Sequence, residues 1–414
     1  MAIDELAGKS DEMLAVTKAG QLLATYKSYV GILEVILDEI TKGIAPRQDA
    51  NSLLGQAVDF FTQPYIVSLA ASYAQTPESF KNIASTIVYS MPFQAYDVDV
   101  KPALLKLIRS YESDKQALSV VMGSATELLE TEELDPEDSE FDNILEDRLN
   151  NFLKCLENLC RDSIHKLTIA YQESPKNLSS ALSVIARWMD ESNMDGAAID
   201  QLAQAFMEDP VLALAKAGKR NEAGKYPIGE NFIRSLARVV NDESEQGVSA
   251  HVQKIKRGAY ALGQEKVISA AHKFYGNEIA LERFVFWIGE TAYFPKDPES
   301  VATVAEALAQ DEVVRVSETY FRAYPGSREP LKAVMNSIGQ AASGLDKESV
   351  KKVAEGFQNP EVVRVAGNYK EQGLDDGLYR FLGEIASAAI EGKTDILPVI
   401  AAKWDIDPVT HKPR

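Results

Sequence analysis

The chain has 414 residues and a formal net charge of −19 at pH 7, and hydrophobic residues make up 45% of it. This length exceeds what one ordinary hydrophobic core supports, so it predicts several domains or one extended array. The acidic balance argues against a general affinity for polyanions.

The N-terminal sequence MAIDELAGKSDEM is acidic and has no apolar core, which is unlike a signal peptide. Residues 60–76 form the longest uncharged stretch, but Pro64 and several polar residues make it unsuitable as a membrane span. Cys155 and Cys160 cannot build a disulfide framework. We therefore expect a cytoplasmic protein without a membrane partner.

A ten-residue pattern recurs along the chain, with apolar residues at its third and sixth positions and a tyrosine at its tenth. In chain order it reads TKAGQLLATY from 17, PYIVSLAASY from 64, PALLKLIRSY from 102, DSIHKLTIAY from 162, PVLALAKAGK from 210, HVQKIKRGAY from 251, DEVVRVSETY from 311 and PEVVRVAGNY from 360. The copy from 210 lacks the tyrosine, and the copy from 251 fits only after a shift of one residue. Apolar residues at i, i+3 and i+7 form one stripe of a helix, and a leading proline suits the first helical position. Each copy therefore predicts a short helix.

A second predicted helix follows each of these short helices. An apolar residue opens it seven positions after the tyrosine in five copies, and after a longer turn in the last two. These residues are Leu33, Phe80, Leu118, Leu178, Val267, Leu331 and Leu378.

Residues 299–320 and 348–369 are near twins, with twelve of 22 positions identical at an offset of 49 and no gap. Strand signals are scarce, because runs such as VVRV recur at helical spacing. Helices repeated every forty to sixty residues are typical of α-solenoids, and the spacing resembles that of HEAT or armadillo repeats. The resemblance implies an all-α chain of tandem helical repeats of about 49 residues that stack into a superhelix. An irregular helical bundle is the alternative.

The domain organisation follows from these patterns and from the distribution of charge. We expect an N-terminal helical cap at 1–50, helical repeats at 51–126, an acidic insertion at 127–147, repeats with a basic middle at 148–298, the tandem 49-residue repeats at 299–396 and a C-terminal tail at 397–414.

The recurring tyrosines are Tyr73, Tyr111, Tyr171, Tyr260, Tyr320 and Tyr369. Because each shares a stripe with Val, Leu or Ile, we expect its ring to pack between units and its hydroxyl to bind a carbonyl at a helix end. The alternative is a ladder of aromatic contacts for a ligand.

The fifth position of the pattern holds Lys106, Lys166, Arg315 and Arg364. This position points away from the apolar stripe, so stacked units would display a cationic row able to hold an acidic segment of a partner. The alternative is a solvated face with local ion pairs, such as Glu312–Arg315 and Glu361–Arg364.

Residues 214–275 are basic, which suggests an alternative anion-binding or nucleic-acid-binding region. Its candidate residues are Lys216, Lys219, Arg220, Lys225, Lys254, Lys256 and Arg257. The segment does not match a P-loop, since Gly218 and Gly224 are wrongly spaced and Tyr226 replaces Ser or Thr. The basic region could equally dock on the acidic residues 127–147.

Residues 127–147 hold eleven acidic side chains and no basic one. Residues 135–146 align with a calcium-binding loop, but Glu140 stands where that loop needs glycine. We therefore expect a solvated insertion rather than a calcium site.

Catalytic motifs are missing, and the four histidines have no metal-ligand spacing, so we expect neither an enzyme nor a cofactor. The sequence favours a protein-binding scaffold or adaptor whose partner is another protein or an acidic peptide. Two alternatives are nucleic-acid binding through residues 214–275, and an all-α enzyme or small-ligand protein with a pocket between units.

Overall fold

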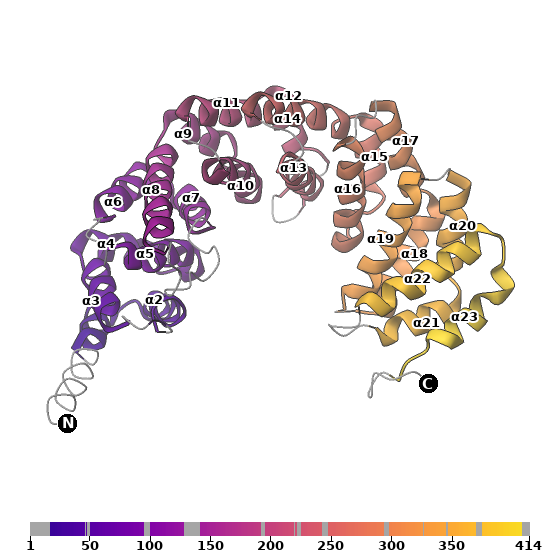
Figure 1. Cartoon of the computed structure of the whole chain (residues 1–414), viewed down its shortest axis with the longest axis horizontal. Coiled ribbons are helices and arrows are strands. Elements are labelled where there is room, and N and C mark those ends of the chain that lie inside the picture. The colour runs from indigo at the N-terminus through magenta and orange to yellow at the C-terminus, as the bar shows by residue number, and fades with distance from the viewer. Residues whose placement is uncertain are drawn as a thin grey trace. The chain divides into compact units, whose positions relative to one another are not determined.

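The computed structural model describes residues 17–45, 47, 50–94, 100–127, 141–191, 195–218, 220–221, 225–241, 247–293, 298–325, 327–344, 347–369 and 375–407. Over these residues the chain is helical and contains no extended strand, which confirms the all-α prediction (Figure 1). None of the helices in this part of the chain is long and apolar enough to cross a membrane. The chain divides into an N-terminal half, residues 1–204, and a C-terminal half, residues 205–414.

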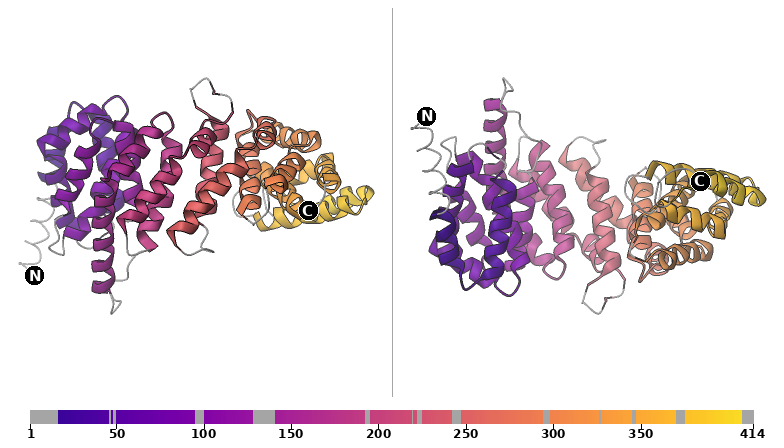
Figure 2. Two further views of the ribbon diagram at one scale, coloured as in Figure 1. Left: turned by 90° about the horizontal axis from the view of Figure 1, so that it is seen from above. Right: turned by 90° about the horizontal axis from the view of Figure 1, so that it is seen from below.

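Residues 17–26 are the first described helical residues of the N-terminal half. The elements that follow are α2 (Val30–Gly43), α3 (Ala50–Phe61), α4 (Pro64–Ser72), η1 (Pro77–Phe80), α5 (Lys81–Gln94), α6 (Lys101–Tyr111), α7 (Lys115–Glu127), α8 (Phe141–Leu159), α9 (Asp162–Ala170), α10 (Pro175–Glu191) and α11 (Gly196–Phe206). Helix α5 packs between α2 and α7, and α7 packs on α10 (Figure 1). These four helices form a layer of neighbours, which we call the N-terminal long-helix layer. Figure 2 shows the same ribbon from above and from below.

The C-terminal half repeats this kind of packing. Its elements are α12 (Asp209–Ala215), α13 (Pro227–Val240), α14 (Val248–Leu262), α15 (Glu265–His272), α16 (Glu278–Tyr293), α17 (Pro298–Leu308), α18 (Asp311–Ala323), α19 (Glu329–Gly344), α20 (Lys347–Phe357), α21 (Pro360–Asn368), α22 (Asp375–Ile390), η2 (Thr394–Ile396) and α23 (Leu397–Trp404). Helix α13 packs on α16, α16 on α19 and α19 on α22, which gives the C-terminal long-helix layer. The expected tail at 397–414 includes α23, which packs on α21 and α22.

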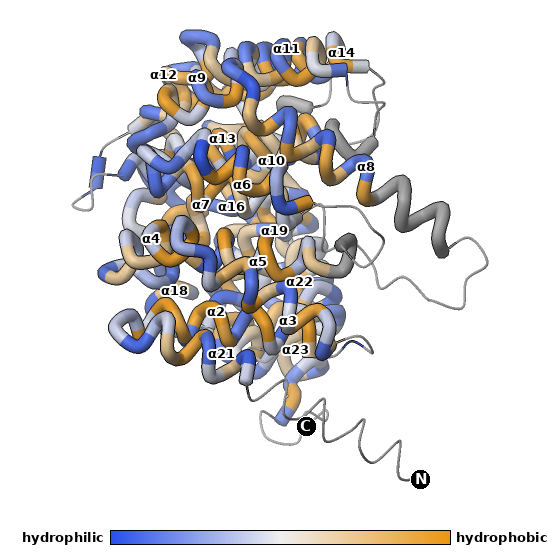
Figure 3. The backbone as a smooth tube through the Cα atoms, turned by 90° about the vertical axis from the view of Figure 1, so that its left-hand side faces the viewer, coloured by the Kyte–Doolittle hydropathy of each residue, from blue (hydrophilic) through white to orange (hydrophobic). Residues whose placement is uncertain are grey.

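The short helices follow the predicted pattern closely. In α21, Asn359 accepts a hydrogen bond from the backbone N–H of Glu361 (3.0 Å) and thereby caps the helix. Val362 and Val365 are fully buried, and Arg364 is exposed. Polar and apolar residues alternate around the helices in Figure 3, as expected for helices that bury one stripe.

The tyrosines at the ends of the short helices hold neighbouring helices together. Four hydroxyls donate to the carbonyl of the last residue of a later helix, and we call this contact the tyrosine clamp. The bonds run from Tyr26 to Phe61 (2.7 Å), from Tyr111 to Leu159 (2.6 Å), from Tyr320 to Phe357 (3.2 Å) and from Tyr369 to Trp404 (2.8 Å). Tyr73 differs, since it donates to the carbonyl of Lys115, the first residue of α7 (2.9 Å).

The predicted packing of the tyrosine rings is therefore confirmed where the clamp is seen. Burial raises the pKa of Tyr111 and of Tyr320 above the ordinary value, so both hydroxyls remain protonated donors over the physiological pH range. The last carbonyls of a helix have no intrahelical N–H donor, and the carbonyls bound by the tyrosine clamp are among these. The carbonyl at a buried helix end thus accepts a hydrogen bond from a side chain of a neighbouring helix.

The pattern placed at 251–260 is wrong. Tyr260 lies on α14 with 65% of its surface exposed, whereas the buried stripe falls on α15 and ends at Phe274. Phenylalanine has no hydroxyl, and here the adjacent Lys273 donates from Nζ to the carbonyl of Ala309 (2.8 Å), just beyond the end of α17. Tyrosine is a poor marker of the buried stripe at this position, because burial of the side chain depends on its ring and not on its hydroxyl.

We predict that Tyr111→Phe lowers the free energy of unfolding by about 1–2 kcal/mol, because the buried carbonyl of Leu159 loses its donor. The measurement is chemical denaturation followed by circular dichroism. The matched control is Tyr260→Phe, which removes an exposed hydroxyl and should leave the transition unchanged. If both variants unfold at the same denaturant concentration, the stabilising role of the tyrosine clamp is contradicted.

Candidate binding face on the C-terminal long helices

The four residues of the predicted cationic row are exposed. Lys106 lies on α6 and Lys166 on α9, while Arg315 and Arg364 lie on α18 and α21. The predicted local ion pairs form, with 3.3 Å between Arg315 and Glu312 and 3.0 Å between Arg364 and Glu361. Arg364 also pairs with Asp405 (3.1 Å). Among the described contacts none joins one member of the row to another, so no continuous site is built from them.

The basic region also spreads over different environments. Lys216, Lys225 and Arg257 are exposed, and the Arg220 guanidinium lies 5.8 Å from the centre of the Tyr226 ring. Lys254 is only 8% exposed, and Lys256 pairs with Glu208 (2.7 Å). These positions do not form one open cluster of cations.

Other predicted features fall outside the described residues. These are Lys219, the segment 128–140 and the side chains of 141–148, so the acidic insertion and the alignment with a calcium loop stay predictions. Within the described ranges, no group of His, Cys, Asp and Glu side chains has the arrangement of a metal site.

A different site begins with the sequence FVFW, residues 284–287. Phe284 and Val285 are buried in the core of the C-terminal half. A helix buries one stripe, so Phe286 and Trp287 lie on the other side of α16, where both are partly exposed. Two large aromatic side chains of α16 are therefore only partly buried within the C-terminal long-helix layer.

Contacts through these aromatic residues link all four helices of the layer. The Arg238 guanidinium of α13 lies 3.8 Å from the centre of the Phe286 ring, and the rings of Phe286 and Trp287 meet edge to face at 5.3 Å. Trp287 Nε1 donates to Asn336 Oδ1 on α19 (3.4 Å). Asn336 Nδ2 then donates to the hydroxyl oxygen of Tyr379 on α22 (3.0 Å). We call Phe286, Trp287, Asn336 and Tyr379 the aromatic strip.

A glycine on α19 makes room for the indole of the strip. A Cβ at Gly339 would lie 2.1 Å from Trp287 Cδ1, which no side chain could tolerate without displacing the ring. Gly339 therefore lets the Trp287 ring lie directly against the α19 backbone. This contact and the bond to Asn336 together fix the orientation of the indole.

Within the described part of the chain, the acidic side chains near the strip pair with some of the neighbouring arginines and not with others. Glu290 pairs with Arg238 (3.2 Å), and Glu282 pairs with both Arg283 (2.5 Å) and Arg328 (3.1 Å). Arg234 on α13 and Arg380 on α22 are also exposed, and neither makes an ion pair with any described residue. Glu290 and Glu282 are thus paired with arginines, whereas Arg234 and Arg380 are exposed, as is Asp376 three residues before Tyr379 on α22.

The sequence pattern did not reveal this site, although one signal was present. Four consecutive large apolar residues cannot all face the core of a helix, so FVFW already indicates two exposed aromatic side chains. Asn336 and Tyr379 carry no such signal, because their role depends on contacts with helices more than forty residues away. With this geometry established, no family model, curated protein or solved structure was found to match the chain.

We predict that Asn336→Ala frees the indole of Trp287, because it removes the acceptor on α19. With 5-fluorotryptophan in place of tryptophan, the ¹⁹F resonance of Trp287, assigned with Trp287→Phe, should shift and narrow. The resonances of Trp188 and Trp404 serve as internal controls and should stay in place. A Trp287 resonance that does not change would show that Asn336 does not hold the ring.

Proposed function

We propose that the chain is an α-solenoid of tandem helical repeats that acts as a non-catalytic scaffold or adaptor in the cytoplasm. Its aromatic strip binds an acidic segment of a partner protein. The single observation that carries this proposal is the unbroken series of contacts from Arg238 to Tyr379 across four neighbouring helices.

Recurring packing supports the solenoid part of the proposal. Helix α15 packs on α17, α18 on α20 and α21 on α23, and each contact lies beside a bond from a clamp tyrosine or from Lys273. In the twin segments 299–320 and 348–369, α18 and α21 begin at corresponding positions, Asp311 and Pro360. Copies that stack on one another in this way produce long faces, and such faces suit extended protein segments.

The composition of the strip supports a protein partner. Tryptophan, tyrosine and arginine are the side chains most enriched at the energetic centres of protein interfaces. The strip is held by hydrogen bonds and ring contacts before any partner binds, so little conformational entropy remains to be lost on binding. Arg234 and Arg380 favour a partner segment that is acidic and carries an apolar anchor, and they would also accelerate its encounter.

The proposed function predicts that Trp287→Ala abolishes partner retention. Wild-type protein and variants are immobilised, exposed to extract from the native source at moderate salt, with and without nuclease, and the retained proteins are identified by mass spectrometry. Proteins that depend on the strip should stay on the wild type and be lost from Trp287→Ala. A charge-reversal variant, Arg234→Glu with Arg380→Glu, should weaken their binding by about tenfold, as expected for the loss of two cationic contacts.

Tyr260→Ala is the matched control, since it removes an exposed aromatic side chain of the same half outside the strip. Proteins retained equally by Trp287→Ala and the wild type would contradict a role for the strip. Retention that disappears after nuclease treatment would instead favour nucleic acid as the partner.

A further inference from the structure

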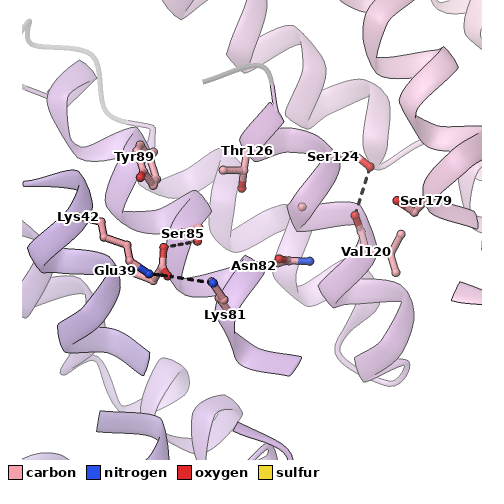
Figure 4. A pocket seen from close by; sticks show the side chains of 11 residues that line it. Glu39, Lys42, Lys81, Asn82, Ser85, Tyr89, Val120, Ser124, Thr126 and Ser179 are labelled. Carbon is pink, nitrogen blue, oxygen red and sulfur yellow. Dashed lines mark hydrogen bonds and ion pairs between the residues drawn. The ribbon is translucent and has the colours of Figure 1, made fainter. Parts of the chain in front are cut away.

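The N-terminal long-helix layer contains a cavity of about 360 Å³, shown in Figure 4. Glu39 and Lys42 of α2 and Lys81 and Ser85 of α5 lie together on one side of it. The rest of the wall comes from α5, α7 and α10, and consists of Asn82, Tyr89, Val120, Gly123, Ser124, Thr126 and Ser179.

Glu39 is a buried carboxylate that lacks a full set of donors. Only 3% of its surface is exposed. Oε2 accepts a hydrogen bond from Ser85 Oγ (2.5 Å), but Oε1 has no hydrogen-bond partner. Burying a carboxylate oxygen without a hydrogen-bond donor costs free energy. A ligand that donates a hydrogen bond to Oε1 would remove this cost.

Two lysines approach this oxygen without bonding to it. Lys42 Nζ lies 3.8 Å and Lys81 Nζ 4.0 Å from Glu39 Oε1. Charge-assisted hydrogen bonds are shorter, at about 2.7–2.9 Å. Lys42 is already bonded to Asp38 (2.5 Å), and this bond raises its pKa. Both lysine side chains are about half exposed, so moving them into solvent costs little.

Three hydroxyl groups of the wall can act as acceptors toward the cavity. Ser85 donates to Glu39, Ser124 donates to the carbonyl of Val120 (3.2 Å), and Thr126 bonds to the carbonyl of Met122 (3.1 Å) and to the hydroxyl of Thr86 (2.7 Å). The oxygen lone pairs of these groups remain for a ligand that donates. The cavity therefore combines a buried negative charge with further acceptors.

We propose that this cavity binds a guanidinium group. A guanidinium carries a permanent positive charge and five N–H donors in a planar fork, which matches a carboxylate surrounded by acceptor oxygens. An anion would be attracted by the Lys42 and Lys81 ammonium groups that line the cavity, but it would be repelled by Glu39 and would leave Oε1 of that residue without a donor. The guanidinium displaces the Lys81 ammonium from beside Glu39 and takes its place as the counter-ion. It belongs either to an arginine of a partner peptide or to a free guanidino compound.

The test uses two probes against the full chain, N-acetyl-argininamide and a short neutral peptide with one central arginine. Binding is measured by isothermal titration calorimetry, with N-acetyl-lysinamide and inorganic phosphate as comparison ligands. The wild type should bind the arginine probes and bind N-acetyl-lysinamide more weakly. Tighter binding of the peptide would assign the site to a partner arginine, and equal binding of the two probes would assign it to a free compound.

Three variants decide which groups bind the ligand. Glu39→Gln should weaken binding of the arginine probes by at least about tenfold, because it removes the buried charge. Glu34→Gln makes the same change on an exposed residue of α2 outside the cavity and should have no effect. Lys81→Gln should strengthen binding, because it removes the competing cation.

Several results would overturn the proposal. They are no binding of either arginine probe by the wild type, full binding by Glu39→Gln, weaker binding by Lys81→Gln, or preferential binding of N-acetyl-lysinamide or phosphate. Circular dichroism of each variant separates loss of the site from loss of the fold. None of these measurements involves the aromatic strip, so the two proposals fail independently.

Discussion

The architecture depends on one hydrogen bond that recurs along the chain, from a tyrosine hydroxyl to the carbonyl at the end of a later helix. Helix ends leave carbonyls without intrahelical partners, and burying them requires donors from elsewhere. Tyr26, Tyr111, Tyr320 and Tyr369 supply those donors while their rings fill the space between helices. One tyrosine side chain thus donates a hydrogen bond to the carbonyl at a helix end and fixes the spacing of neighbouring helices. A short helix can therefore recur along the chain without leaving a buried carbonyl unpaired.

Because these contacts lie at the ends of short helices, the outward faces of the long helices are free to vary. In the C-terminal half that face carries the aromatic strip, where Arg238 lies over Phe286 and Asn336 joins Trp287 to Tyr379. In the N-terminal half, polar and charged side chains, among them Lys42 and Lys81, surround the buried Glu39. We propose an acidic segment with an apolar anchor as the partner of the first surface, and a single cationic group as the ligand of the second. The same kind of helix packing therefore carries side chains of different chemical character in the two halves.

The sequence predicts the helices and their buried stripes well, because both depend on residues that are close in the chain. The cap at Asn359 and the burial of Val362 and Val365 follow from local spacing alone. A pattern defined by tyrosine does not include Phe274, where the adjacent Lys273 supplies the donor instead. The aromatic strip and the cavity depend on partners from other helices, as with Glu39 and Ser85, which are 46 positions apart. Local periodicity does not specify such pairs.

The most direct measurement of the clamp is a double-mutant cycle at the position where lysine replaces it. Lys273→Met and Phe274→Tyr are made singly and together in an Asp311→Asn background, because Lys273 also pairs with Asp311, and the free energy of unfolding is measured for each. If a buried helix end needs one donor, Lys273→Met destabilises by about 1 kcal/mol and the new tyrosine hydroxyl recovers part of that loss. Phe274→Tyr would then be more favourable in the Lys273→Met protein than in its parent. Strictly additive effects would contradict the account, because they would show that the two donors do not serve the same helix end.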